Sequence, residues 1–186
     1  MGPIRFPYNL TNTWHSIRNW YNQTLYWPQV INLCIMKPLY VLLGSFVVSL
    51  LSIKFITTTF NYPLAGRIAM SVMLLFTAIG HFAFTKGMVL MMPDFLPFKK
   101  QLVWVTGFVE IAAAAGLLLP ALQQTAAWLL ILFFVLILPV NINAALKHID
   151  YQKGSYEGPG AGYLWFRVPL QLLFIGWVYW FALRAA

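Results

Sequence analysis

The sequence predicts an all-α, polytopic membrane protein built as a helical bundle. Three observations support this: 61% of the 186 residues are hydrophobic, only 9% are charged, and the apolar residues gather in five long runs. An ordinary soluble domain carries roughly 25% charged residues, so the composition excludes a cytosolic globular enzyme. It also excludes a disordered chain, which needs few apolar residues and many charges.

Each apolar run is close to the roughly 20 residues that a helix needs to cross a bilayer. The third and fourth helices must be antiparallel neighbours, because only the short segment 121–124 joins them. Residues 1–37 form a tail, residues 38–66 an extra membrane helix with its loop, and residues 67–186 a four-helix membrane domain. The predicted helices cover Leu39–Ile56, Arg67–Leu90, Leu102–Leu122, Thr125–Leu146 and Tyr163–Arg184.

The tail is rich in aromatic residues interleaved with polar ones. It lacks the apolar core and small-residue cleavage site of a secretory signal peptide. Aromatic rings with polar groups favour the headgroup layer, so we expect an interfacial segment. It either anchors passively in the bilayer or docks to another membrane-protein subunit. The candidate partner-binding residues are Trp14, Trp20, Tyr21 and Trp27.

The net charge of +8 has a topological explanation. The lysines and arginines flank the apolar runs, so we expect membrane lipids as partners and no nucleic acid. The side with the N terminus and segments 91–101 and 147–162 has more of them than the side with Lys54, Arg67 and Arg184. This bias places the N terminus in the cytoplasm, in a bacterial-type inner membrane.

Six polar residues lie where the bilayer should exclude them. From the helical rise, His81 and Glu110 lie about 12 Å below the N-terminal face. Asn141 lies about 8 Å and Arg167 about 6 Å below the same face. Four helices therefore place polar groups in one layer. The candidate ligand-binding or proton-handling residues are His81, Glu110, Asn141, Asn143, Arg167 and Gln171.

The polar layer admits two interpretations. We predict that Glu110 pairs with Arg167, because a lone charge in the membrane costs about 3 kcal/mol. The layer then either exchanges protons or holds a polar head group such as that of a quinone, or it forms a structural network that sets helix register. Cys34 is the only cysteine and no catalytic motif occurs. We therefore expect no metal, no intrinsic cofactor and no catalysis by this chain alone, with a quinone or lipid as a possible ligand.

Two connecting segments have further sequence signals. Residues 92–98 contain two prolines and two aromatic residues, which suits a lid over the polar layer or an interfacial turn. Residues 154–162 contain four glycines and Pro159. This composition predicts a mobile segment, acting as a gate or as a plain connector.

Six motifs occur in order along residues 67–184. They are GHF at 80–82, MPDFLP at 92–97, TGFVEI at 106–111, GLLLP at 116–120, PVNINAAL at 139–146 and WFRVPLQ at 165–171. In these motifs the chain resembles the DoxX-like family of small membrane proteins. The aromatic tail and first helix, residues 1–66, lie outside the family's usual four-helix unit.

The resemblance implies a four-helix membrane bundle whose polar positions are His81, Glu110, Asn141 and Arg167. Some DoxX-like proteins are associated with sulfur oxidation through quinone or with oxidative-stress complexes. It therefore implies a redox-associated accessory subunit of a membrane complex with electron-transfer or quinone-linked activity. The alternatives are a purely structural or assembly subunit and a stand-alone small-molecule or quinone carrier.

Overall fold

The computed structural model describes residues 36–185 of the chain. The chain divides into two units, Met1–Lys37 and Pro38–Ala186, and the fold described below belongs to the second. The four aromatic residues that the sequence suggests for partner binding lie outside the described residues; they are Trp14, Trp20, Tyr21 and Trp27.

The described residues confirm the predicted all-α membrane bundle. Residues 36–185 contain five helical spans that are long and apolar enough to cross a membrane, so this is a multi-pass membrane protein. The last span, Ala161–Arg184, consists of a 3-10 turn, an α-helix and a π-helical end. The elements are α2 (Lys37–Thr57), α3 (Tyr62–Ala83), α4 (Thr85–Met91), α5 (Lys99–Leu118), α6 (Gln123–Leu146), η1 (Ala161–Tyr163), α7 (Leu164–Val178) and η2 (Tyr179–Arg184).

The second predicted helix, Arg67–Leu90, differs from the structure at both ends. α3 begins earlier, because Asn61 caps it by accepting a hydrogen bond from Leu64 N at 3.0 Å. The predicted helix also breaks at Phe84, where α3 ends and α4 begins. Thr85 Oγ1 donates to the carbonyls of His81 (2.7 Å) and Phe82 (3.0 Å), and such local bonds compete with the helical ladder.

The third predicted helix, Leu102–Leu122, is too long at its C-terminal end. α5 ends at Leu118 because Leu119 precedes Pro120, and a residue before proline is driven out of the helical region. α6 then starts at Gln123 after a short turn. A Cβ on Gly116 would lie 2.7 Å from Ala126 Cβ, so the two helices lie side by side as predicted.

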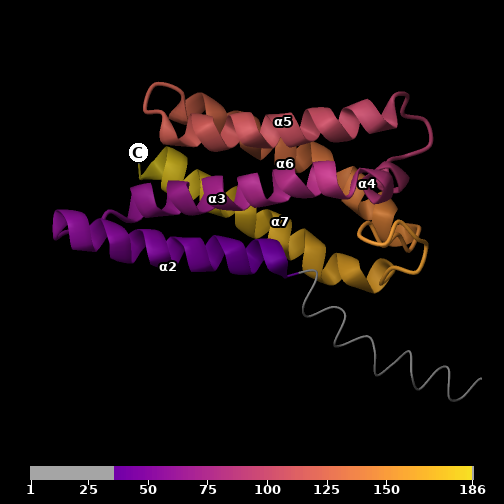
Figure 1. Cartoon of the computed structure of the whole chain (residues 1–186), viewed down its shortest axis with the longest axis horizontal. Helices are drawn as coiled ribbons and strands as arrows, with labels where there is room; N and C mark the ends of the chain where they lie inside the picture. The colour runs from indigo at the N-terminus through magenta and orange to yellow at the C-terminus, as the bar shows by residue number, and fades with distance from the viewer. Residues whose placement is uncertain (1–35, 186) are drawn as a thin grey trace, which may run out of the picture. The chain divides into compact units, whose positions relative to one another are not determined.

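Four of the spans form a closed ring, and α2 packs on its outside. α3 lies beside α5, α5 beside α6, α6 beside α7, and η2 beside α3 (Figure 1). Leu42 is the buried residue of α2, and the helix meets α7 where the rings of Phe46 and Trp177 stand edge to face at 5.1 Å. The rest of α2 is largely exposed and apolar.

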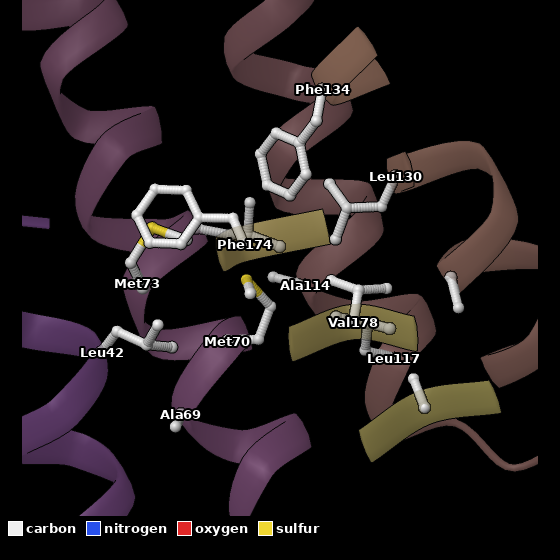
Figure 2. Close-up of a cluster of buried hydrophobic side chains, with 13 residues drawn as sticks. Leu42, Ala69, Met70, Met73, Ala114, Leu117, Leu130, Phe134, Phe174 and Val178 are labelled. Carbon is white, nitrogen blue, oxygen red and sulfur yellow. The ribbon is translucent and has the colours of Figure 1, made fainter. Parts of the chain in front are cut away.

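The core lies between the four ring helices. Met70 and Met73 of α3, Leu130 of α6 and Val178 of α7 each expose about 1% of their surface. Figure 2 shows these side chains converging with the ring of Phe134. Leucine and phenylalanine side chains make up much of this core. Its methionines adapt to irregular gaps, and its alanines let neighbouring helices approach closely.

One end of the ring is tied together by a carboxylate. Asp94, in the segment between α4 and α5, bonds to Lys147 Nζ at 2.7 Å and to Lys99 Nζ at 3.2 Å. Lys147 follows α6 and Lys99 opens α5, so a single side chain links three parts of the chain. The hydrogen bond from Lys147, then that from Lys99, lowers the pKa of Asp94 below its ordinary value.

Acidification is expected to loosen residues 92–98. The folded pKa of Asp94 is depressed, so its link is fully formed above the pKa of an unfolded aspartate and is lost as the pH falls through the lowered folded value. Hydrogen–deuterium exchange of residues 92–98 against pH measures this. Asp94→Asn should exchange faster than wild type at neutral pH and equally fast below the folded pKa. Equal exchange at neutral pH would show that the link does not hold this segment.

The glycine-rich segment after α6 is folded against α4. A Cβ on Gly87 would overlap the carbonyl oxygen of Tyr151, so the two backbones are in direct contact. Gly158 N donates to the carbonyl of His148 at 2.6 Å, and a Cβ on Gly158 would lie 2.5 Å from the carbonyl carbon of Ile149. These glycines allow close backbone packing, and the mobility that the composition predicts for residues 154–162 stays a prediction.

Candidate functional site

The candidate site begins with a close approach of two helices. Gly107 of α5 faces His81 of α3, and a Cβ at Gly107 would lie 3.0 Å from His81 Cβ. A small residue here brings the helices together and places the imidazole between two side chains of α5. His81 exposes 8% of its surface and Glu110 exposes 5%.

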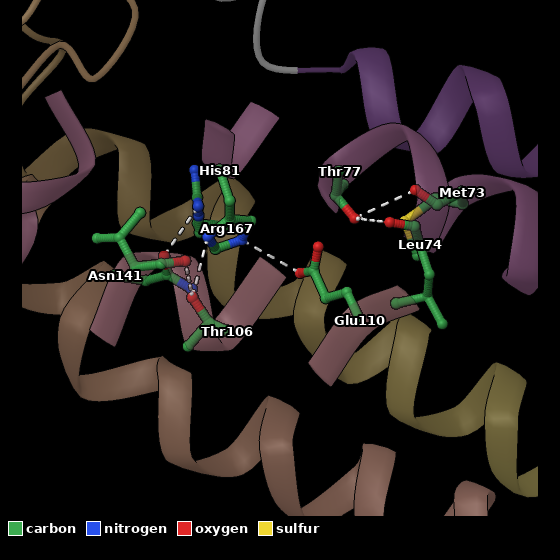
Figure 3. Close-up of polar contacts among 9 residues, drawn as sticks. Met73, Leu74, Thr77, His81, Thr106, Glu110, Asn141 and Arg167 are labelled. Atoms are coloured by element: carbon green, nitrogen blue, oxygen red, sulfur yellow. Dashed lines mark hydrogen bonds and ion pairs between the residues drawn. The ribbon is translucent and has the colours of Figure 1, made fainter. Parts of the chain in front are cut away.

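We call His81, Thr106 and Glu110 the histidine cluster. His81 Nδ1 lies 3.0 Å from Thr106 Oγ1, and His81 Nε2 lies 3.4 Å from Glu110 Oε1 (Figure 3). Thr106 and Glu110 are one helical turn apart, so both face α3. The second carboxyl oxygen, Glu110 Oε2, is buried and has no hydrogen-bond partner among residues 36–185.

The hydrogen bonds of this cluster join α3 to α5. Thr106 Oγ1 donates to the carbonyl of Val103 at 2.8 Å, and the direction of its 3.0 Å bond with His81 Nδ1 is set by the imidazole tautomer. His81 Nε2 faces Glu110 Oε1. One proton between these atoms gives either an imidazolium and a carboxylate or a neutral imidazole and a carboxylic acid. In both forms a single proton joins the two side chains in a hydrogen bond or an ion pair.

The remaining candidates form a second group, the arginine cluster of Tyr163, Arg167, Asn141 and Gln171. Arg167 Nη1 donates to Tyr163 Oη at 2.7 Å, and Nη2 donates to Asn141 Oδ1 at 2.8 Å. Asn141 Nδ2 donates to Gln171 Oε1 at 3.0 Å. Gln171 Nε2 in turn donates to the carbonyl of Phe134, in the turn that precedes Pro139. This chain of donors and acceptors joins α6 to α7.

The prediction that Glu110 pairs with Arg167 is wrong. Within the described part of the chain, Glu110 contacts His81 and Arg167 contacts Asn141 and Tyr163. Residue spacing gives the depth of each side chain but not the direction in which it points around the helix. Glu110 points towards α3, whereas Arg167 finds an amide acceptor on its immediate neighbour, α6.

Asn143 has a separate role among the candidates. Its Nδ2 donates to the carbonyl of Met91 at 2.7 Å, which fastens α6 to the end of α4. Thr77, one turn before His81, donates only within its own helix, to the carbonyls of Met73 and Leu74. Neither residue belongs to the two clusters.

Sequence reasoning missed Thr106, Tyr163 and Gln123. Thr106 precedes Glu110 by four residues and Tyr163 precedes Arg167 by four, so an i,i+4 search around each charged residue would have found both. Gln123 is buried and donates to the carbonyl of Ala182 at 2.8 Å. It stands at the start of a helix, where a glutamine gives no signal of burial.

The described residues contain no group of three or more His, Cys, Asp or Glu that could hold a metal ion. The two clusters offer hydrogen-bond donors and acceptors inside the membrane-spanning bundle. The histidine cluster has a buried acceptor without a partner among the described residues, whereas the members of the arginine cluster hydrogen-bond to one another.

Fold and site together define a class: a multi-pass, all-α membrane protein with polar clusters buried between its helices. The chain belongs to the family described as a domain of unknown function (DUF8561), which matches residues 70–182, more than half of the chain. No curated protein and no solved structure matches the chain. The matched region contains every residue of the histidine and arginine clusters.

Proposed function

We propose that this chain is a DoxX-like accessory subunit of a quinone-linked membrane complex, and that its histidine cluster exchanges a proton with a bound head group. The observation that carries the proposal is the buried contact of His81 Nε2 with Glu110 Oε1 at 3.4 Å, beside the unpartnered Glu110 Oε2. Ionisable residues inside a membrane are costly and mark functional sites by default.

The chemistry of the cluster suits a quinone or a quinol. A quinone carbonyl accepts a hydrogen bond, and a quinol hydroxyl donates one. His81 and Glu110 share a proton, so the pair offers a donor in one state and an acceptor in the other. The partner subunits of the complex would supply the electron carriers, and this chain would supply proton exchange and positioning. Catalysis by this chain alone is not part of the proposal.

The membrane and the partner contacts complete the proposal. Lys and Arg are more numerous on the side of the N terminus, which supports a cytoplasmic N terminus in a bacterial-type inner membrane. The aromatic tail is the proposed partner-binding segment. A mild-detergent pull-down of the full chain from native membrane, followed by mass spectrometry, tests this. A stoichiometric redox subunit supports the proposal, and recovery of the chain alone contradicts it.

Replacing Glu110 by glutamine is expected to lower the activity of the isolated complex at least tenfold while assembly survives. Glutamine keeps the size and one hydrogen bond but cannot take up the proton, and general acid–base groups typically contribute about 100-fold or more. Activity per assembled complex is the measurement.

Thr77→Val is the matched control for Glu110→Gln. Thr77 lies on the same helix as His81, one turn away, and its hydroxyl bonds only within α3. We expect the valine variant to keep wild-type activity. Full activity of Glu110→Gln, or loss of assembly in that variant alone, would contradict the proton-exchange role.

The arginine cluster supports a second candidate function, that of a structural or assembly subunit. Its chain of hydrogen bonds from Tyr163 to Gln171 joins α7 to α6. A continuous polar network of this kind can set the register of two helices. Retention of full complex activity by Glu110→Gln would favour this second function.

A further inference from the structure

A second unexplained polar group lies at the opposite end of the bundle from Asp94. Here α2 ends, α3 begins and η2 brings the chain to its C-terminal end (Figure 1). The cations at this end are Lys54 of α2, Arg67 of α3 and Arg184 of η2. Arg67 stands inside a membrane span, one and a half turns from the start of α3.

Arg67 has no acidic partner among residues 36–185. Its Nε is buried and lacks a hydrogen-bond partner, and no hydrogen bond or ion pair joins the guanidinium to another residue among residues 36–185. A guanidinium has five N–H donors in a fixed planar arrangement. Leaving a charged group unpartnered in a membrane span is costly, so the free protein is missing an acceptor at this place.

The chain itself has no acidic side chain to supply that acceptor. It contains four aspartates and glutamates in total, and none lies in residues 1–35. Asp94 binds Lys99 and Lys147, and Glu110 faces His81. Asp150 accepts from two backbone amides of its own turn. Glu157 lies in the same segment as Asp150, between α6 and α7, at the far end of the bundle.

Arg184 of η2 lies at the same end of the bundle as Arg67 of α3. η2 packs against α3, because a Cβ on Gly66 would overlap the ring of Phe181, and Trp177 Nε1 donates to the Gly66 carbonyl at 3.0 Å. Arg184 lies one turn beyond Phe181, with its guanidinium carbon 4.4 Å from the centre of the Trp180 ring. Stacking on an aromatic ring holds a guanidinium in place and leaves its edge free to bind an anion.

We propose that Arg67 and Arg184 bind the phosphate group of a membrane phospholipid. Arg67 lies in the first turns and Arg184 at the last residue of helices long and apolar enough to span a membrane, and the ends of such helices meet the head-group layer. Guanidinium groups bind phosphate through paired N–H···O bonds, and cationic sites at the ends of membrane helices recognise anionic lipid head groups. The lipid supplies the acceptor that the sequence lacks, and this site is separate from the histidine cluster.

Native mass spectrometry of the purified full chain, titrated with phosphatidylglycerol, tests the proposal. We expect one phosphatidylglycerol to bind in preference to diacylglycerol, which has the same acyl chains but no phosphate. Arg67→Gln and Arg184→Gln should each weaken binding about fivefold, since one cation near a membrane surface contributes about a factor of that size. Arg67→Lys, which keeps the charge, should recover most of the affinity.

Lys100→Gln is the matched control, because Lys100 is also a cation stacked on a tryptophan, 4.8 Å from the Trp104 ring, but at the other end of the bundle. We expect it to bind phosphatidylglycerol as wild type does. Millimolar inorganic phosphate should not displace the lipid. Three results would overturn the proposal: equal binding of diacylglycerol, equal loss in Lys100→Gln, or displacement by inorganic phosphate, which would identify a site for free anions.

Arg67→Gln could lose binding merely because it misfolds. The helical content and the gel-filtration volume of each variant therefore accompany the titration. Arg184→Gln provides an independent reading, because Arg184 is exposed at the end of the chain and carries no packing role in the core. Unchanged binding by a correctly folded Arg184→Gln, together with loss in Arg67→Gln only on misfolding, would also refute the site.

Discussion

Gly87→Ala is expected to destabilise the protein by about 3 kcal/mol, the upper part of the range for overpacked positions. The added methyl group would overlap the carbonyl oxygen of Tyr151 and lie 2.5 Å from its carbonyl carbon. A backbone carbonyl cannot rotate away as a flexible side chain can. α4 must therefore separate from the segment after α6, opening the small core of Met91, Ala144 and Ile149.

Thermal unfolding in detergent measures this effect, and Gly176→Ala is its control. Gly176 lies in α7 with no heavy atom within 4 Å of an added Cβ. Alanine there is expected to leave the midpoint unchanged or to raise it slightly, because alanine is the better helix former. If both alanine variants unfolded at the same temperature, the close contact between α4 and Tyr151 would be disproved.

Asn141→Leu is expected to cost about 3 kcal/mol, because it breaks the centre of the arginine cluster. Asn141 accepts a hydrogen bond from Arg167 and donates one to Gln171. Its loss therefore leaves both the charged guanidinium of Arg167 and the buried amide oxygen of Gln171 without this partner. Leucine has a similar size and keeps the apolar packing. The loss of free energy therefore reports hydrogen bonding and not a cavity.

Asn143→Leu provides the comparison two residues along the same helix. Asn143 makes one neutral bond, to the carbonyl of Met91, and single interhelical hydrogen bonds in membranes contribute about 0.6 kcal/mol on average. We expect this variant to unfold close to wild type in a chemical or thermal titration. Equal destabilisation by the two leucine variants would mean that Arg167 gains nothing from Asn141.

Much of the fold is predictable because each span is a local property. An apolar run of sufficient length must become a membrane helix, since the bilayer leaves no other way to satisfy its backbone. The helix ends depended on single residues: Asn61 moved the start of α3, and Pro120 shortened α5. Neither Phe84 nor Thr85, where α3 ends and α4 begins, is a proline or a glycine. The sequence therefore predicts one continuous helix across this break.

The sequence predicts which residues form the candidate site, but it does not predict which of them contact one another. Placing His81 and Glu110 at the same depth identified two residues that the structure brings within 3.4 Å. The need to neutralise a charge in the membrane predicted a pair of Glu110 with Arg167, which instead bonds to Asn141. Depth follows from counting residues along one helix, whereas pairing depends on which helices are neighbours and how each is rotated about its axis.

The sequence by itself determined the class of the molecule, its five spans and the set of polar residues inside the membrane, because composition and hydropathy act on each segment separately. Only the tertiary structure decided that these residues divide into a histidine cluster, which has a buried acceptor without a partner among residues 36–185, and a separate arginine cluster. It also showed that Gly87 and Gly158 serve close packing, and that the buried Nε of Arg67 has no hydrogen-bond partner among residues 36–185. These facts depend on contacts between segments far apart in the chain, and such contacts leave no local pattern in the sequence.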